Sequence, residues 1–178
     1  MRWILRILGG LVVLVVVLGA VGMVLPRIVT VERSVAIDAP PETVFPRINS
    51  LQAAAEWSPW LELDPDVQTT YSGPESGVGN RLEWASEHPQ VGNGTQEIVE
   101  SAAPERVVSA LDFGDMGGGT ATFVLAAEGA GTLVTWGLDA DLGAGPVGRW
   151  MGLMMDNWVG ADFETGLAQL KTLVEAES

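Results

Sequence analysis

The sequence predicts an α+β domain in which a curled antiparallel sheet of seven strands wraps around one long C-terminal helix, with two short helices, all preceded by a single transmembrane helix. Three observations lead to this prediction. Residues 7–25 carry no charge, alternating segments punctuated by Gly and Pro fill residues 28–141, and an apolar helical pattern covers residues 147–176. The strands follow one another too closely for parallel crossovers, so we expect hairpins.

The uncharged N-terminal segment has the length of a membrane span. Residues 7–25 would rise roughly 28 Å as a helix, close to the ~30 Å hydrocarbon core of a bilayer. Pro26 cannot continue the helix and marks its end. Arg2 and Arg6 precede the segment, and this bias favours an N-terminus in the cytoplasm. We therefore expect a single-pass anchor at residues 1–26 and an extracytoplasmic domain at residues 27–178.

A cleaved signal peptide is the competing interpretation of the same segment. Ala20-Val21-Gly22 matches the small-residue pattern of a cleavage site. The apolar run is longer than the usual signal core, however, and it continues past this site to Leu25. We favour the anchor for this reason.

The rest of the chain is strongly acidic. Residues 34–178 hold 22 acidic and 5 basic side chains, and the whole chain has a formal net charge of −14. Such a surface repels nucleic acid, so we expect no nucleic-acid partner. The chain has no cysteine, which excludes disulfides, thiolate metal sites and cysteine nucleophiles.

Hydropathy and turn residues predict the order of the elements. Residues 28–38 alternate as a strand, Pro41 and Glu42 suit the first turn of a helix, and a second short helix is expected at 51–56. Further strands are expected at 67–73, 78–86, 94–102, 106–114, 119–128 and 131–141, and the final helix at 147–176. The first half of that helix is apolar over an unusually wide arc.

This order, together with several local motifs, resembles the START-like helix-grip superfamily. The opening Val-Glu-Arg-Ser-Val-Ala-Ile-Asp-Ala-Pro-Pro-Glu-Thr-Val-Phe at 31–45 carries the resemblance, with Trp-Ser-Pro-Trp at 57–60 and Gly-Thr-Leu-Val-Thr-Trp at 131–136. The chain is most similar to bacterial SRPBCC, or polyketide cyclase/dehydrase-like, proteins with an N-terminal membrane segment. The resemblance covers residues 28–176. It implies the helix-grip fold, but that superfamily hosts binding, transfer and catalysis on one scaffold.

Seven large side chains fall on elements that border the interior in a helix-grip fold. We expect them to line an apolar pocket for a small hydrophobic ligand or a lipid, because aromatic and Met side chains give large and adaptable contact areas. They are Trp60, Tyr71, Trp84, Trp136, Trp150, Met154 and Trp158. The alternative is that the same side chains simply pack the core. No catalytic residue is carried over from the resemblance, and no cofactor or metal is expected.

Two other functions remain open at this stage. Glu83, Glu97 or Glu100 could act as a general acid or base in a cyclase, aromatase or dehydratase if one of them faced the interior, although solvent-facing positions are favoured for all three. The acidic surface could instead meet a basic partner at the membrane. His88, the single histidine, precedes a proline in a predicted hairpin loop and is expected to be exposed.

Overall fold

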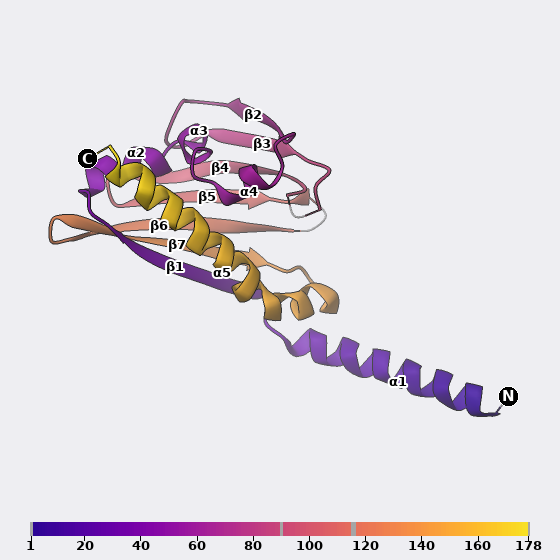
Figure 1. The fold of residues 1–178 in the computed structure, drawn as a ribbon. Coiled ribbons are helices and arrows are strands. Elements are labelled where there is room, and N and C mark those ends of the chain that lie inside the picture. The colour runs from indigo at the N-terminus through magenta and orange to yellow at the C-terminus, as the bar shows by residue number, and fades with distance from the viewer. Residues whose placement is uncertain (1, 90, 115–116, 178) are drawn as a thin grey trace.

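The computed structural model describes residues 2–89, 91–114 and 117–177, and a helix-grip architecture is plain in it (Figure 1). The helices are α1 Arg2–Val24, α2 Pro41–Ile48, α3 Leu51–Ala54, α4 Pro59–Leu63 and α5 Pro146–Glu175. The strands are β1 Ile28–Ile37, β2 Gln68–Ser72, β3 Arg81–Ala85, β4 Asn93–Ala102, β5 Arg106–Asp112, β6 Gly118–Glu128 and β7 Gly131–Asp141.

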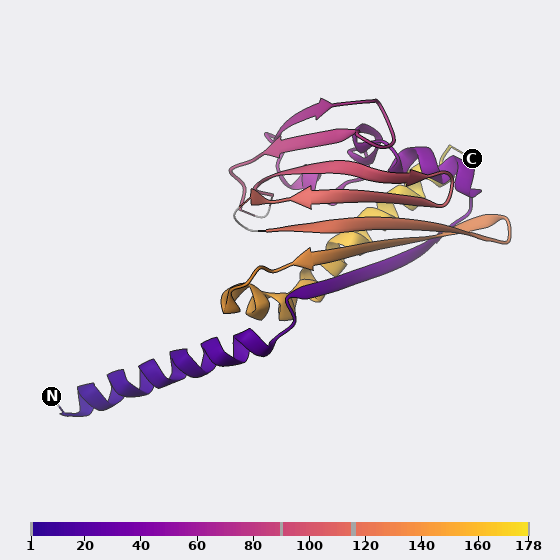
Figure 2. The same ribbon diagram turned by 180° about the vertical axis from the view of Figure 1, so that it is seen from behind.

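The seven strands form one antiparallel sheet in the order β1-β7-β6-β5-β4-β3-β2. Consecutive strands are neighbours from β2 to β7, as short hairpins require, and β1 closes the far edge by pairing with β7. All the helices after β1 lie on one face of the sheet, whereas Figure 2 shows the opposite face uncovered. The predicted sheet and its covering helix are therefore confirmed.

The short helices differ from the expected two. A third one, α4, begins at Pro59, just beyond the second helix expected at 51–56. Proline suits this first helical position because its fixed φ is already helical and the N–H it lacks would have no helical partner. Strand β3 begins later than expected, at Arg81, since Gly77 and Gly79 before it adopt positive φ angles of 76° and 87°.

The long helix α5 packs most closely against β1. Gly160 lies against Arg33, so near that an added Cβ would overlap the guanidinium group. Arg33 in turn bonds Asp156 at 3.0 Å and Glu164 at 2.9 Å, one on each side of this glycine. A small residue and a bracket of ion pairs thus hold the middle of α5 on the edge strand.

Helix α1 projects away from the domain (Figure 1). Its segment Arg6–Val24 is long and apolar enough to cross a membrane, and nearly all of its surface is exposed. A signal sequence would meet the same criteria of length and composition. The expected orientation in the membrane depends in part on the charge of Arg2, whose side chain is not among those that the structure describes.

Candidate functional site

The inner face of the sheet, the face toward α5, can be followed row by row from the strand register. One row runs Tyr71–Leu82–Gln96–Leu111–Gly119–Ala140–Val29 across all seven strands. This row lies toward the end of the sheet where β1 leaves α1, and we call it the proximal row. A second inward-facing row lies four residues further along each strand, away from α1, and we call it the distal row. It consists of Val107, Phe123, Trp136 and Arg33.

The distal row is filled by aromatic rings. Trp136 stacks on Phe163 of α5 at a centroid distance of 3.9 Å and on Phe123 at 4.9 Å. Trp57 and Trp60 each meet Trp136 edge-on at 5.5 Å. Phe163 is 1% exposed, so sheet and helix are in direct contact here. This part of the interior is a packed core.

The proximal row is lined differently. Its positions at the centre of the sheet carry small or medium side chains, and Tyr71, Gln96, Leu111 and Gly119 are only half-buried although they face inward. Trp84, next to this row on β3, is also half-buried and lies across Gly94, where an added Cβ would be 2.5 Å from the ring. Solvent therefore reaches the inner face of the sheet at this end, over a predominantly apolar surface.

Few polar groups accompany this apolar surface. Burial raises the pKa of the Tyr71 phenol, and a hydrogen bond with the Thr69 side chain opposes this shift. A phenol is neutral near pH 7 even at its ordinary pKa, so the Tyr71 hydroxyl can donate a hydrogen bond. The Trp60 indole N–H donates to Asp162 Oδ2 at 3.2 Å, at the edge between α4 and α5. The buried indole N–H of Trp136 has no acceptor within the part of the chain that the structure describes. Such a donor costs roughly 1–3 kcal/mol when it is left without a partner.

The three glutamates considered as acid or base groups lie away from this surface. Glu83 is exposed and pairs with Thr70 and Thr95 on the outer face. Glu97 forms an ion pair with Arg81 at 3.1 Å, and Glu100 with Arg106 at 3.0 Å. The alternation of β3, which puts Trp84 inward, sends Glu83 outward.

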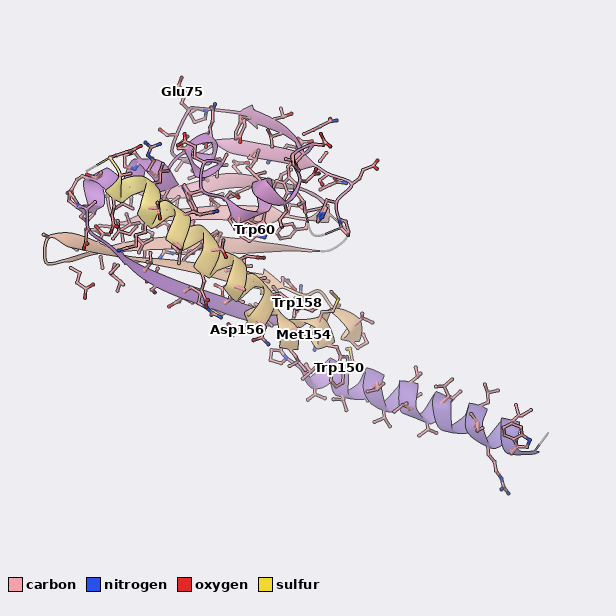
Figure 3. The ribbon with its side chains drawn as sticks, in the orientation of Figure 1. Trp60, Glu75, Trp150, Met154, Asp156 and Trp158 are labelled. Carbon is pink, nitrogen blue, oxygen red and sulfur yellow. The ribbon has the colours of Figure 1, made fainter. Side chains whose placement is uncertain are left out.

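The structure separates the seven residues of the predicted pocket into two groups. Trp60, Tyr71, Trp84 and Trp136 lie on or beside the inner face, as described above. Trp150, Met154 and Trp158 lie on another side of α5, near α1 (Figure 3). Trp150 donates its N–H to the carbonyl of Leu18 at 3.0 Å, and Met154 and Trp158 are 49% and 52% exposed. Ligand contact by any of the seven stays a prediction.

Sequence reasoning did not select several residues that adjoin the inner surface. Leu111 and Gln96 lie in the proximal row, and the Phe113 ring meets Trp84 edge-on at 6.0 Å. On α5, the partly buried side chains that pack against the core are Met155 and Val159. They directly follow Met154 and Trp158 in the sequence, which face another side of the helix. The alternation of β5 could have pointed to Leu111, but the cross-strand register was needed to bring it beside Tyr71 and Trp84.

Two open hollows occur elsewhere on the surface and contain none of the seven predicted residues. One follows the outer side of α5 from Ala161 to Leu173, and the other lies around Arg27 and Gly117. Across the described residues, no group of three His, Asp or Glu side chains is arranged to hold a metal ion. Asp64 accepts a hydrogen bond from Ser86 at 2.5 Å, which lowers the pKa of the carboxyl group and joins the end of α4 to the residue after β3.

Comparison with solved structures supports the architecture. The protein TTHA0849 from Thermus thermophilus shares 22% identity at a TM-score of 0.62, over 84% of this chain and 99% of that chain. CV1439 from Chromobacterium violaceum shares 20% identity at a TM-score of 0.59, over 82% and 96%. The di-domain ARO/CYC StfQ from the steffimycin biosynthetic pathway has a TM-score of 0.63 at 11% identity, over 85% of this chain and 52% of that one. At such identities the likeness is one of fold.

A family model described as "Polyketide cyclase / dehydrase and lipid transport" matches residues 29–175. The chain belongs to this family. No curated protein gave a significant match. Membership supports a ligand-binding helix-grip domain. The identity of the ligand, and the choice between binding and catalysis, must be argued from the residues of the site, because one fold hosts several functions.

Proposed function

We propose that this member of the polyketide cyclase / dehydrase and lipid transport family is a membrane-anchored module that binds a small hydrophobic ligand or a lipid between its sheet and α5. The observation that carries the proposal is the half-buried proximal row. If the sheet and α5 were in direct contact here, as they are at the distal row, the inward-facing residues of this row would be fully buried. Four of them are only half-buried: Tyr71, Gln96, Leu111 and Gly119. An apolar surface that faces inward but remains wet is suited to a ligand that replaces the water.

The chemistry of the surface favours a mostly apolar ligand with one or two polar atoms. Trp84, Leu111 and Trp60 offer apolar contact area. The neutral Tyr71 hydroxyl is a hydrogen-bond donor. The half-buried side-chain amide of Gln96, in the same row, offers both a donor and an acceptor. No carboxylate is among the inner-face residues of the proximal row, so a cationic ligand is not favoured.

Binding without chemical conversion is favoured over catalysis. Glu83, Glu97 and Glu100 lie outside the inner surface, and two of them are engaged in ion pairs. One observation keeps cyclase or dehydratase chemistry as the second candidate: the neutral Tyr71 hydroxyl on the inner face has the protonation state of a general acid. Replacing Tyr71 by Phe would separate the two, since it would abolish acid catalysis and only weaken binding.

The anchor in this proposal is α1, with the domain boundary near Pro26. Exposed Val and Leu side chains on every side of α1 support insertion into lipid, because water would be a poor solvent for such a surface. With α1 inserted and its N-terminus in the cytoplasm, residues 27–178 would work at the outer surface of the membrane. A ligand could then pass between bilayer and domain over a short distance.

Filling the inner surface tests the proposal. We expect Leu111→Trp to remove ligand that co-purifies with the full chain in mild detergent, as detected by organic extraction and mass spectrometry. Val124→Trp is the matched control, because Val124 lies on the uncovered face of β6 and is 39% exposed. Circular dichroism checks that both variants fold. Recovery of wild-type chain without any bound hydrophobic molecule, or equal loss in both variants, contradicts the proposal.

A further inference from the structure

The first turns of α5 are bonded to the end of α1. Arg149 Nη1 donates to the carbonyl oxygens of Met23 at 2.6 Å and Leu25 at 3.1 Å, and the Trp150 indole N–H donates to Leu18 at 3.0 Å. The carbonyls at a helix C-terminus have no intrahelical partner, so Arg149 supplies one. Gly22 permits this approach, since an added Cβ would lie 2.6 Å from Pro146 and 2.8 Å from Trp150.

These contacts place the start of α5 within the depth of the anchor. Leu18 lies six residues before Val24, so the bond from Trp150 reaches about 9 Å back along α1 from its C-terminal end. The apolar segment Arg6–Val24 has about the length needed to cross the hydrocarbon core, with little to spare. If α1 spans the bilayer, the first turns of α5 therefore lie beside the part of α1 that meets the bilayer interface.

The same turns of α5 expose large apolar side chains (Figure 3). We call them the α5 apolar patch: Val147, Met151, Leu153, Met154 and Trp158, which are 71%, 54%, 58%, 49% and 52% exposed. Four of them, all except Leu153, follow one stripe at helical spacing, and Leu153 lies on the other side of Trp150. A contiguous exposed surface of this kind usually marks an interaction site.

The charges around the patch suit an interface with lipid. Residues 142–155 hold no carboxylate in a chain of 23 acidic residues, and their single charge, Arg149, bonds α1 carbonyls. At the borders of this segment the two nearest acids are paired: Asp141 with Arg27 at 2.6 Å and Asp156 with Arg33 at 3.0 Å. An acidic protein would otherwise be repelled by anionic headgroups.

We propose that the α5 apolar patch inserts into the outer interface of the bilayer that α1 crosses, and so fixes the orientation of the domain on the membrane. The occupant is lipid because the patch continues the exposed apolar surface of α1, which lipid must cover if α1 is an anchor. Trp158 suits this depth, because an indole has a polar N–H for the headgroups and an apolar ring for the acyl chains. The Met, Val and Leu side chains of the patch would supply the apolar area that is buried in the acyl region. The inference rests on the anchor of the proposed function.

The absence of native cysteines allows a direct measurement of depth. Single variants Met151→Cys, Met154→Cys, Val13→Cys and Val78→Cys of the full chain are spin-labelled in dioleoylphosphatidylcholine nanodiscs. Collision rates are then measured with oxygen, which enters lipid, and with a water-soluble nickel complex. Val13 reports on the middle of α1. Val78, which is 60% exposed and lies near the α2 end of the sheet, is the control in water.

We expect the labels at residues 151 and 154 to lose most of their collisions with nickel relative to residue 78, while keeping those with oxygen. Nickel access at 151 and 154 equal to that at 78, with 13 protected, overturns the inference and leaves the anchor intact. Nickel access at 13 means that the anchor itself fails. Spin–spin broadening at residue 151 that vanishes on dilution with unlabelled chain shows a second copy on the patch, and this also overturns the inference.

Discussion

The two halves of α5 have similar apolar content and opposite surroundings. In the half after Gly160, Phe163, Leu167 and Leu170 are at most 2% exposed against the sheet. In the half before it, Met151 and Trp158 leave about half of their surface uncovered within the chain. The apolar content of a helix segment therefore does not by itself show which part of the helix packs against the rest of the chain.

The sheet below α5 also has one tightly packed end and one accessible end. Its distal row carries Phe123 and Trp136, whose rings fill the space below the helix, whereas its proximal row has Gly119 and Ala140 at the corresponding strands. One sheet thus provides a rigid packed end and an accessible end close to α1. The packed end supports the fold, and the proposed ligand surface and the proposed membrane contact both lie at the accessible end.

The largest effect that tests this contrast is expected from aromatic truncations on α5. Phe163→Ala should lower the free energy of unfolding by about 3–5 kcal/mol, because it opens a cavity in the packed end. Trp158→Ala, in the other half of the helix, should change it by less than about 0.5 kcal/mol. Urea unfolding of the full chain in detergent micelles measures both. Equal costs would mean that the halves are packed alike.

An intermediate effect is expected at the contact between α1 and α5. Gly22→Leu should destabilise that contact by about 1–3 kcal/mol, since the new side chain would overlap Pro146 and Trp150. Gly19→Leu is the control, as nothing lies within 4 Å of a Cβ added there. Limited trypsin digestion at Arg149 reports on the contact. Unchanged digestion in Gly22→Leu would show that α1 and α5 are not held together in solution.

The smallest effect concerns the exposed ion pair at the accessible end. The Arg27 guanidinium lowers the pKa of Asp141 from 3.8 to about 2. Because this folded-state pKa is depressed, the pair stabilises the fold above about pH 4, and this contribution is lost as the pH falls toward 2. Arg27→Gln should return the pKa of Asp141 toward 3.8, as followed by carboxyl NMR. Arg106→Gln, which removes a distant pair with Glu100, should leave it unchanged.

Much of the fold was predictable because its signals are local. The alternation of residues 28–38, the glycine-rich turns and the long C-terminal pattern each follow from backbone geometry over a few residues. The missed helix α4 is the exception that fits this explanation. A helix of five residues has too few positions for a periodic pattern, so only Pro59 at its start could have indicated it.

The candidate site was less predictable, because membership in it depends on contacts between distant segments. Trp84 and Glu83 could be assigned to opposite faces of β3 from alternation alone, and the structure agrees. Leu111 could not be linked to Tyr71 and Trp84 without the register of β2 to β5. On α5, the apolar arc is wide enough to include both Met154 and Trp158 and the neighbouring Met155 and Val159. The sequence could not tell that Met155 and Val159 are the residues that pack against the core.

The sequence by itself determined every element except α4, the order of these elements, an apolar N-terminal helix and an acidic domain without cysteine chemistry. Tertiary structure alone decided that Phe123, Trp136 and Phe163 close one end of the interior, that the other end stays partly open, and that Trp150 bonds to α1. The physical reason is that periodicity fixes which side chains share a face of one element. Which faces then meet depends on strand register and on close approaches such as Gly22 and Gly160, and these exist only in the folded chain.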